Sequence, residues 1–321
     1  MNFHELFAHF GDITVDGLTK GSIYALVALG YTLVYGVLKL INFAHSEVFM
    51  VGTWTVLGAY SLVGADEGSG VGILIIATVL GFLLAPLASA GTALAVERIA
   101  YRPLRRKNAP PLIFLITAIG CSLVLTETFG QALHAIFGPP FGRAAVSIPS
   151  LIPEKEWVNL SWIAISNTQI LVIVAAIVMM VALDAFVNRS RLGRGVRAVA
   201  QDPDTAALMG VNQDRVIMLI FVLGGAMAGI AAMLYTIRYD ITKFDIGFLI
   251  GVKAFTAAVL GGIGNLRGAL VGGLVLGVVE VYSSTLFSSN WEDVTAFVVL
   301  VLVLMFRPTG ILGESLAKAR A

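Results

Sequence analysis

The sequence NRSRLGRGVRAVAQDPDTAALMGVNQDRVI, residues 188–217, is the longest polar interval between two apolar runs that are each long enough to cross a bilayer. Within it, Asp202 and Pro203 predict the N-cap and the first residue of a short helix that reaches Met209, and Gly210 predicts a left-handed C-cap. Four arginines precede this helix, at Arg189, Arg191, Arg194 and Arg197. Because Lys and Arg gather in cytoplasmic connections of membrane proteins, we expect this interval to face the cytoplasm.

The short helix offers a small and mostly apolar surface, made by Ala206, Ala207, Leu208 and Met209. An apolar surface beside a basic segment can dock into a groove on a cytoplasmic partner. The same residues also fit a solvated basic loop that the positive-inside rule holds in place. The residues of this interval alone leave both interpretations open.

Composition decides the class of the whole chain. Of its 321 residues, 58% are hydrophobic and 13% are charged, and the mean hydropathy is +0.89, which excludes an ordinary soluble domain. Apolar runs of about 20 residues, the length that crosses a bilayer, lie at 14–38, 45–64, 71–97, 111–136, 167–187, 215–236, 268–287 and 293–307, with a shorter one at 249–263. We expect an all-α, polytopic membrane protein with eight or nine transmembrane segments, which forms one transmembrane domain over residues 1–321.

Basic residues also predict orientation. The connections after the third and fifth runs and the C-terminal segment hold most of the arginines, and therefore should face the cytoplasm. This arrangement places the N-terminus outside and requires an odd number of crossings, which counts 249–263 as a crossing. At 1.5 Å per residue that run spans about 22 Å, less than the roughly 30 Å hydrocarbon core. The connection 138–166 should be an interfacial flap on the outer side.

The stretch KLINFAHSEVFM, residues 39–50, interrupts the apolar pattern with Asn42, His45, Ser46 and Glu47. Polar groups at membrane depth must face protein or water, so this stretch fits a broken helix that lines a substrate path, with Asn42 and Glu47 as candidate lining residues. It also fits an ordinary polar turn on the cytoplasmic side. His45 and Glu47 are too few ligands for a metal site, and we expect none.

The stretch GGIGNLRGALVGGLVLG, residues 261–277, repeats glycine every fourth residue, which leaves bare backbone on one helix face. This pattern predicts close helix packing. It lacks the Lys followed by Ser or Thr that a phosphate-binding loop requires, so we expect no nucleotide or other cofactor in this chain.

Lys253, Glu280 and Glu127 are charged residues inside apolar runs. Lys253 and Glu280 lie near the outer ends of neighbouring antiparallel segments, and we expect them to form an ion pair, because either charge alone in hydrocarbon is costly. Glu127 lies deep in its run and has no obvious partner in the sequence.

Four blocks of the chain resemble, in order, the LivH-type permease of branched-chain amino acid ABC importers. They are GLTKGSIYALVALGYTLVYGVLKLINFAHSEVFMVGTW, YRPLRRK, GRGVRAVAQDPDTAALMGVNQDRVI and GVKAFTAAVLGGIGNLRGALVGGLVLGVVE. The resemblance implies an ABC importer permease fold in a bacterial inner membrane, and half of a heterodimeric pore. The implied partners are a LivM-like permease, two cytoplasmic ATPases that bind the ATP, and a periplasmic protein that binds leucine, isoleucine or valine.

The resemblance further implies that residues 201–210 form the coupling helix that the ATPases move. The residues implied in coupling are Gln201, Asp202, Pro203, Thr205, Ala206, Ala207, Leu208 and Gly210. Thr205, Ala206, Ala207 and Gly210 are similar to the EAA-and-glycine motif of ABC importers. Thr205 stands where that motif has Glu, and Gly210 comes one residue early.

Alternatives from other classes remain open at this point. Permeases of the same type for urea, amides or aromatic acids share these features, and an ion-coupled secondary transporter would use Glu127 and Glu280. A membrane enzyme would need a constellation such as HExxH or GxSxG, and neither occurs. The net charge of +1 gives no reason to expect a nucleic-acid partner.

Overall fold

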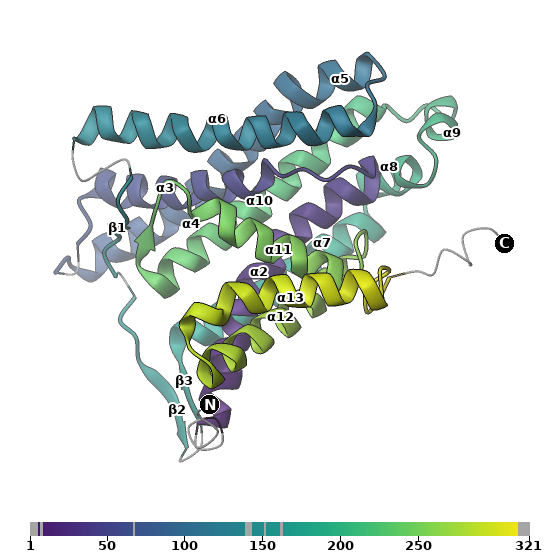
Figure 1. Cartoon of the computed structure of the whole chain (residues 1–321). Coiled ribbons are helices and arrows are strands. Elements are labelled where there is room, and N and C mark those ends of the chain that lie inside the picture. Colours follow the sequence, from purple (N-terminus) through teal and green to yellow (C-terminus); the bar gives the residue numbers. More distant parts are fainter. Residues whose placement is uncertain are drawn as a thin grey trace. The chain divides into compact units, whose positions relative to one another are not determined.

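The structure is a computed structural model, and it describes residues 6, 9–66, 68–138, 143–150, 152–160 and 163–313. Helices dominate, as expected (Figure 1). Their bounds are α2 Phe10–Leu38, α3 His45–Val63, α4 Val71–Val96, the π-helix η1 Glu97–Tyr101, α5 Arg102–Arg106, α6 Pro111–Phe137, α7 Asn167–Arg189, α8 Arg191–Gln201, α9 Pro203–Leu208, α10 Gln213–Tyr239, α11 Ile246–Gly261, α12 Leu266–Leu286, the 3-10 helix η2 Ser289–Trp291 and α13 Glu292–Phe306.

In the part of the chain that the structure describes, four short strands depart from the all-α expectation, β1 Val146–Ser147, β2 Glu156–Leu160, β3 Ile163–Ser166 and β4 Ile241–Thr242. The strands β2 and β3 form an antiparallel hairpin in which Leu160 pairs with Ile163, and β1 pairs with β4 in antiparallel register. The connection 138–166 therefore contains a hairpin and a strand rather than only an irregular flap.

Seven helical segments among the described residues are long and apolar enough to cross a membrane: 10–38, 71–106, 111–135, 167–189, 213–239, 266–286 and 289–306. The expectation of eight or nine crossings is not confirmed. Helix α3 has His45, Ser46 and Glu47 in its first turn, and α11 has only 16 residues. Both are helical where an apolar run was expected.

The chain forms two compact units, one from 1–32, 154–193 and 253–321 and the other from 33–153 and 194–252. In the second unit, α3, α4 and α10 pack on one another. Small residues bring them close: a Cβ on Gly225 of α10 would lie 2.8 Å from the Cα of Ala90 in α4. The Ser89 hydroxyl donates to the Val48 carbonyl at 2.9 Å, which ties α4 to α3.

In the first unit, α12 packs against α2 and α13, and the expected close packing by glycine is confirmed. Gly273 and Gly277 meet α2, where a Cβ on Gly21 would lie 2.8 Å from the Cα of Leu274. Gly268 and Gly272 meet α11 on another face of α12. Gly264 is not in the helix, because it adopts φ 100° just before Asn265 caps α12.

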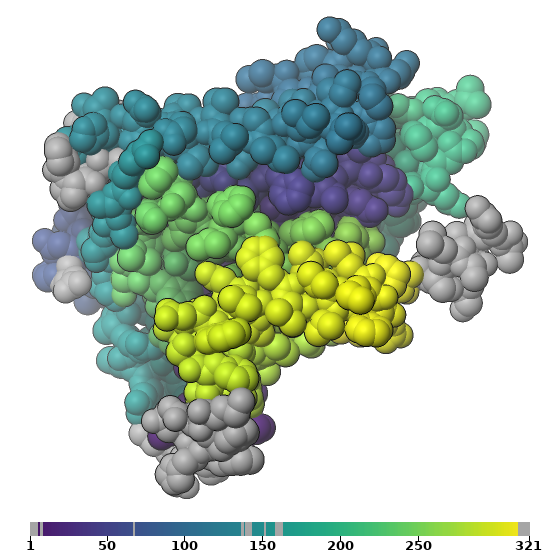
Figure 2. Space-filling model, viewed as in Figure 1, coloured from purple at the N-terminus to yellow at the C-terminus, as the bar shows by residue number. Residues whose placement is uncertain are grey.

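Apolar side chains cover the exposed surface of the outermost helices. Helix α13 lies at the surface in Figure 2, and its exposed residues include Val294, Phe297, Val298, Val301, Leu302, Leu304, Met305 and Phe306. In a water-soluble protein such a continuous apolar face would be buried. It fits contact with lipid or with another membrane protein.

Candidate functional site

The predicted short helix of the polar interval is present as α9, and both of its predicted caps are confirmed. Asp202 accepts hydrogen bonds from the N–H groups of Asp204 and Thr205, at 3.0 and 3.1 Å. At the other end Gly210 has φ 84°, its N–H donates to the Ala207 carbonyl, and the Val211 N–H donates to the Ala206 carbonyl. These two bonds form a Schellman motif, so α9 is fixed at both ends.

The Thr205 hydroxyl donates to the second oxygen of Asp202 at 2.6 Å. This bond, together with the Thr205 backbone N–H, lowers the pKa of Asp202 from its ordinary value. The cap therefore carries its negative charge at neutral pH, where it favours the positive N-terminal end of α9.

Exposure separates the side chains of α9 that can reach a partner from those that cannot. Leu208 is 88% exposed and Met209 is 80% exposed, and Ala207 is exposed beside them. Ala206 is only 4% exposed, so its expected place on the apolar surface is wrong. Its side chain faces its own unit, because the helix turns it about 100° away from its neighbour Ala207.

The polar interval contains a second helix that the sequence analysis did not expect. Helix α8 spans Arg191–Gln201, with Val196 and Val199 buried and its arginines exposed. The turn from α7 into α8 needs Gly193, because a Cβ there would collide with the carbonyl oxygens of Phe186 and Val187. Of the four arginines, Arg189 is the last residue of α7, and the other three lie on α8 rather than on an irregular loop.

Helix α9 is tied to α10, which follows it. The Gln213 side chain donates to the Pro203 carbonyl at 2.6 Å, and Asn212 caps α10 by accepting from the Arg215 N–H at 3.0 Å. Next to Gln213, Asp214 accepts a hydrogen bond from the guanidinium group of Arg105, at the end of α5, with 2.6 Å between Nη2 and Oδ1.

Arg105 binds a second carboxylate, Glu97 of η1, at 3.2 Å. Glu97 is fully buried, and Arg102 lies near both Glu97 and Asp214, at 4.0 and 3.3 Å. Glu97 was not among the residues predicted from the sequence, although a carboxylate eight residues before Arg105 in a basic connection was an available signal. Arg102 and Arg105 therefore form a clamp, which joins η1 and α5 to the first turn of α10 through Glu97 and Asp214.

The π-helix also reaches the interrupted stretch between α2 and α3. The Tyr101 hydroxyl donates to the Asn42 side-chain oxygen at 3.1 Å, and Asn42 is 3% exposed. The Tyr101 ring packs against Phe114 and Phe221. Lys39 starts the interruption with a positive φ of 55°, which ends α2. Asn42 is thus held inside the protein rather than in a solvated turn.

Glu47, in the first turn of α3, is fully buried. The Ser122 hydroxyl of α6 donates to its Oε1 at 3.0 Å, and Ser46 Oγ lies 3.2 Å from the same oxygen. Gly247, in the first turn of α11, lies against Oε2, because a Cβ on Gly247 would be 2.7 Å from it. No group of three His, Cys, Asp or Glu in the described parts of the chain could hold a metal ion here or elsewhere.

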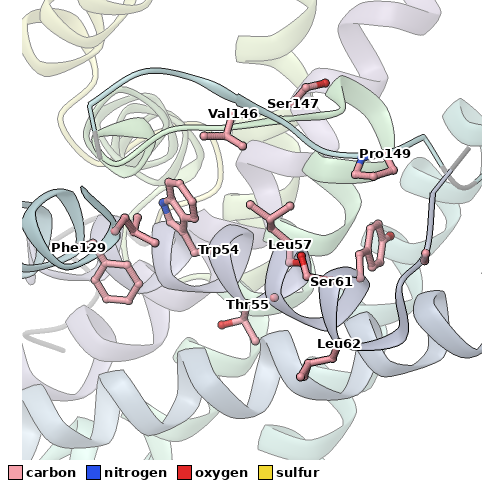
Figure 3. Close-up of a pocket in the computed structure, with 13 residues that line it drawn as sticks. Trp54, Thr55, Leu57, Ser61, Leu62, Phe129, Val146, Ser147 and Pro149 are labelled. Carbon is pink, nitrogen blue, oxygen red and sulfur yellow. The ribbon is translucent and has the colours of Figure 1, made fainter. Parts of the chain in front are cut away.

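An apolar cavity of about 890 Å³ lies further along α3 and α6 in the same unit. Figure 3 shows Trp54 and Phe129 at one side of it and Pro149, after β1, at the other. Leu57, Leu133 and Val146 complete most of the apolar wall, and none of the lining residues that the structure describes is charged. Cavities of this volume and character hold small apolar ligands in many proteins.

In the first unit, Lys253 and Glu280 are in contact, as the sequence analysis expected, with 2.5 Å between Nζ and Oε1. They belong to a larger cluster. Lys20 lies 3.1 Å from Glu280 and also pairs with Glu292, while Lys253 also pairs with Asp293 at 2.7 Å. Glu280 is fully buried and accepts from the Tyr24 hydroxyl at 3.2 Å.

Glu127 does have a partner, which corrects the sequence analysis. Arg143 lies 3.1 Å from it, and the side chains of Glu127 and Arg143 are 53% and 70% exposed. No pattern along the chain predicted this pair, because Arg143 lies in the connection after α6, beyond the helix that carries Glu127.

A family model described as "Branched-chain amino acid transport system / permease component" matches residues 13–304, which is most of the chain. The chain belongs to this permease family. Several relatives match it over almost their full length. It is 42% identical to the high-affinity branched-chain amino acid transport system permease protein BraD of Pseudomonas aeruginosa, over 95% of this chain and 96% of that one.

The permease is also 42% identical to the high-affinity branched-chain amino acid transport system permease protein LivH of Escherichia coli K12, with 97% of each chain covered. A probable branched-chain amino acid transport permease LivH of Methanocaldococcus jannaschii is 24% identical over 96% of this chain. Together with the seven long apolar helical segments found among the described residues, these matches make it a multi-pass membrane protein and confirm the resemblance seen in its sequence.

Proposed function

We propose that this chain is the transmembrane permease subunit of an ABC importer for branched-chain amino acids in a bacterial inner membrane. It supplies half of a heterodimeric pathway, with a LivM-like permease as the other half. Two cytoplasmic ATPases bind and hydrolyse the ATP, and a periplasmic binding protein delivers the cargo. The names of the full-length relatives and the family match support this assignment.

The observation that carries the coupling role is the exposure of Leu208 and Met209 on a helix capped at both ends. Exposure of two large apolar side chains, at 88% and 80%, is unfavourable in water. Their entry into an apolar groove on a partner lowers the free energy. The caps keep α9 rigid, so a force on these side chains moves α9 as one body. We assign α9 and its flanks, 201–210, to the contact with an ATPase.

Movement of α9 reaches the membrane through bonds within the same unit. Gln213 ties α9 to α10, and Arg105 ties the first turn of α10 to the buried Glu97. When ATP draws the two ATPases together, α9 carries α10 and η1 with it. The paired permeases then change between outward-open and inward-open states, which ATP and cargo favour differently.

Asn42 and Glu47 are our candidates for the polar lining of the path, and the cavity beside Trp54 is a candidate for its apolar part. An aliphatic side chain gains about 25 cal/mol for each Å² of surface that leaves water. A charged side chain would lose its hydration in the same cavity without a counter-charge. This contrast favours hydrophobic amino acids over charged ones.

The coupling role is tested by Leu208→Asp and Ala207→Asp in the complete transporter. We expect both changes to abolish uptake of labelled leucine and co-purification of the ATPases, because a carboxylate cannot be buried in an apolar groove without a partner. The amount of permease inserted in the membrane should not change, because both side chains are exposed.

Leu192→Asp is the matched control, since Leu192 is an exposed leucine, at 60%, on the neighbouring helix α8. It should leave uptake and ATPase association near the wild-type level. Unimpaired uptake in both α9 variants would refute the docking role.

A further inference from the structure

Glu47 is a fully buried carboxylate whose hydrogen-bond donors are hydroxyl groups rather than cations. Four carboxylates in the described part of the unit have a cationic partner within 3.2 Å, namely Glu97 and Asp214 with Arg105, Glu127 with Arg143 and Asp245 with Lys243. The recorded partners of Glu47 are hydroxyl groups. The Ser46 hydroxyl donates its proton to the Phe43 carbonyl at 2.6 Å, so the main hydrogen-bond donor to Glu47 is the Ser122 hydroxyl.

One oxygen of Glu47 has no hydrogen-bond partner. Oε2 is buried and unpaired among the described residues, and the side chain as a whole is 0% exposed. A buried carboxylate without a cation is costly, and in a membrane protein such a group marks a ligand path more often than a structural contact. The unpaired oxygen therefore needs a donor that the described protein does not supply.

That oxygen points at the first turn of α11. Gly247 is the second residue of this helix, and its missing side chain lets the turn approach both Ser46 and Glu47 Oε2. Any Cβ at position 247 would collide with the Ser46 carbonyl. The first turn of a helix has N–H groups without helical acceptors and carries partial positive charge, so it attracts anions.

We propose that Glu47 and the first turn of α11 bind the charged head of the transported amino acid. Glu47 accepts hydrogen bonds from the α-ammonium group. The N–H groups of Ile246 and Phe248 already donate to the Lys243 and Asp245 carbonyls, so the N–H groups of Gly247 and Leu249 bind the α-carboxylate. This inference rests on the proposed import function and assigns the cargo-recognition site within it. In the conformation described, Gly247 covers Oε2, so the site opens when the first turn of α11 withdraws from α3.

Helices α3 and α6, which carry Glu47 and Ser122, lead from this site to the apolar cavity. On α3, the buried residues Met50, Val51 and Trp54 follow Glu47 and pack against Ile246 of α11. On α6, Phe129 follows Ser122 by seven residues, which is about 10 Å along a helix. The cavity at Trp54 and the polar site at Glu47 are thus two neighbouring parts of the path. The cavity accepts the apolar side chain of the cargo, and the site at Glu47 binds its zwitterionic head.

The site predicts a specificity that an apolar path alone would not give. A fatty acid of the same carbon skeleton has no ammonium group, and it brings a second negative charge close to Glu47. The repulsion between two buried carboxylates would exclude it. The permease itself therefore selects for the amino group, in addition to any choice made by the binding protein.

The test compares leucine with 4-methylpentanoate, which is leucine without its ammonium group. Direct binding of each labelled compound to the purified complete transporter, without binding protein, measures the preference of the permease. We expect the wild type to prefer leucine and Glu47→Gln to bind leucine about 10-fold or more weakly, because a charge-assisted bond is lost. Leucine uptake into proteoliposomes should fall with it.

Glu47→Gln keeps the size of the side chain and an oxygen for Ser122, so the transporter should assemble. Glu47→Asp keeps the charge and should retain the preference for leucine, which separates charge from packing. Glu127→Gln is the matched control, because that glutamate is exposed and paired with Arg143. It should leave both binding and uptake unchanged.

Unchanged leucine binding and uptake in Glu47→Gln would overturn the inference while leaving the proposed function intact. A loss of preference in Glu47→Asp as large as in Glu47→Gln would also overturn it, since shape rather than charge would then decide. A wild-type transporter that moves no leucine on ATP would refute the proposed function and the inference together.

Discussion

The buried charge cluster of the first unit predicts that its two central residues tolerate neutralisation unequally. Two lysines, Lys20 and Lys253, face three carboxylates, Glu280, Glu292 and Asp293. Neutralising Glu280 leaves two cations and two anions, and each lysine keeps one carboxylate. Neutralising Lys253 leaves one cation and three anions, and Lys20 is then shared by Glu280, which is fully buried, and Glu292, which is not.

The magnitudes follow from this difference. Removing one partner of a buried ion pair costs about 3–5 kcal/mol when the other charge is left uncompensated, and Lys253→Met approaches the lower end of that range because Lys20 remains. Glu280→Gln keeps an oxygen for Tyr24 and leaves both lysines paired, so its cost is about 1 kcal/mol, that of a hydrogen bond. The double variant should cost less than the sum of the single ones, by about 1–2 kcal/mol.

The assay is SDS-induced unfolding of the purified permease in mild detergent, followed through tryptophan fluorescence. Trp291 directly precedes Glu292 and reports on the cluster. The exposed pair Glu127 and Arg143 is the control, and its neutralisation should cost less than about 1 kcal/mol. Equal costs for the two single variants, or strictly additive costs in the double variant, would refute the reasoning.

Two further predictions concern transmission and the cavity. Arg105→Gln should reduce leucine uptake at least about 10-fold at normal insertion, because Glu97 and Asp214 lose a shared cation. Arg106→Gln is the control and should have little effect, because the Arg106 side chain is 68% exposed. Equal uptake in the two variants would contradict the clamp. Gly58→Phe should fill the cavity without harming the fold, because Gly58 lines it and nothing lies within 4 Å of its added Cβ. Uptake of leucine should fall while Gly72→Phe, also in open space, leaves it unchanged; a Gly58→Phe transporter with full uptake would remove the cavity from the path.

Local features of the sequence predicted local structure well. The apolar runs gave the helices, Asp202 and Gly210 gave both caps of α9, and the glycine spacing of 261–277 gave close packing on α12. The count of crossings could not be settled in the same way. Helix α3 starts with three polar residues and α11 is short, so neither length nor hydropathy decides whether they cross.

The sequence by itself thus determined the membrane class, the position of most helices, the caps of α9 and the family, because each depends on residues close together in the chain or on matches along it. Only the tertiary structure decided which side chains meet. Arg105 and Asp214 are 109 residues apart, Glu47 and Ser122 are 75 apart, and Glu47 meets Gly247 from the other end of its unit. Ala206 and Ala207 are neighbours of identical chemistry, yet one is buried and the other exposed. Such differences follow from how helices pack, and a pattern along the chain does not record which helix faces which.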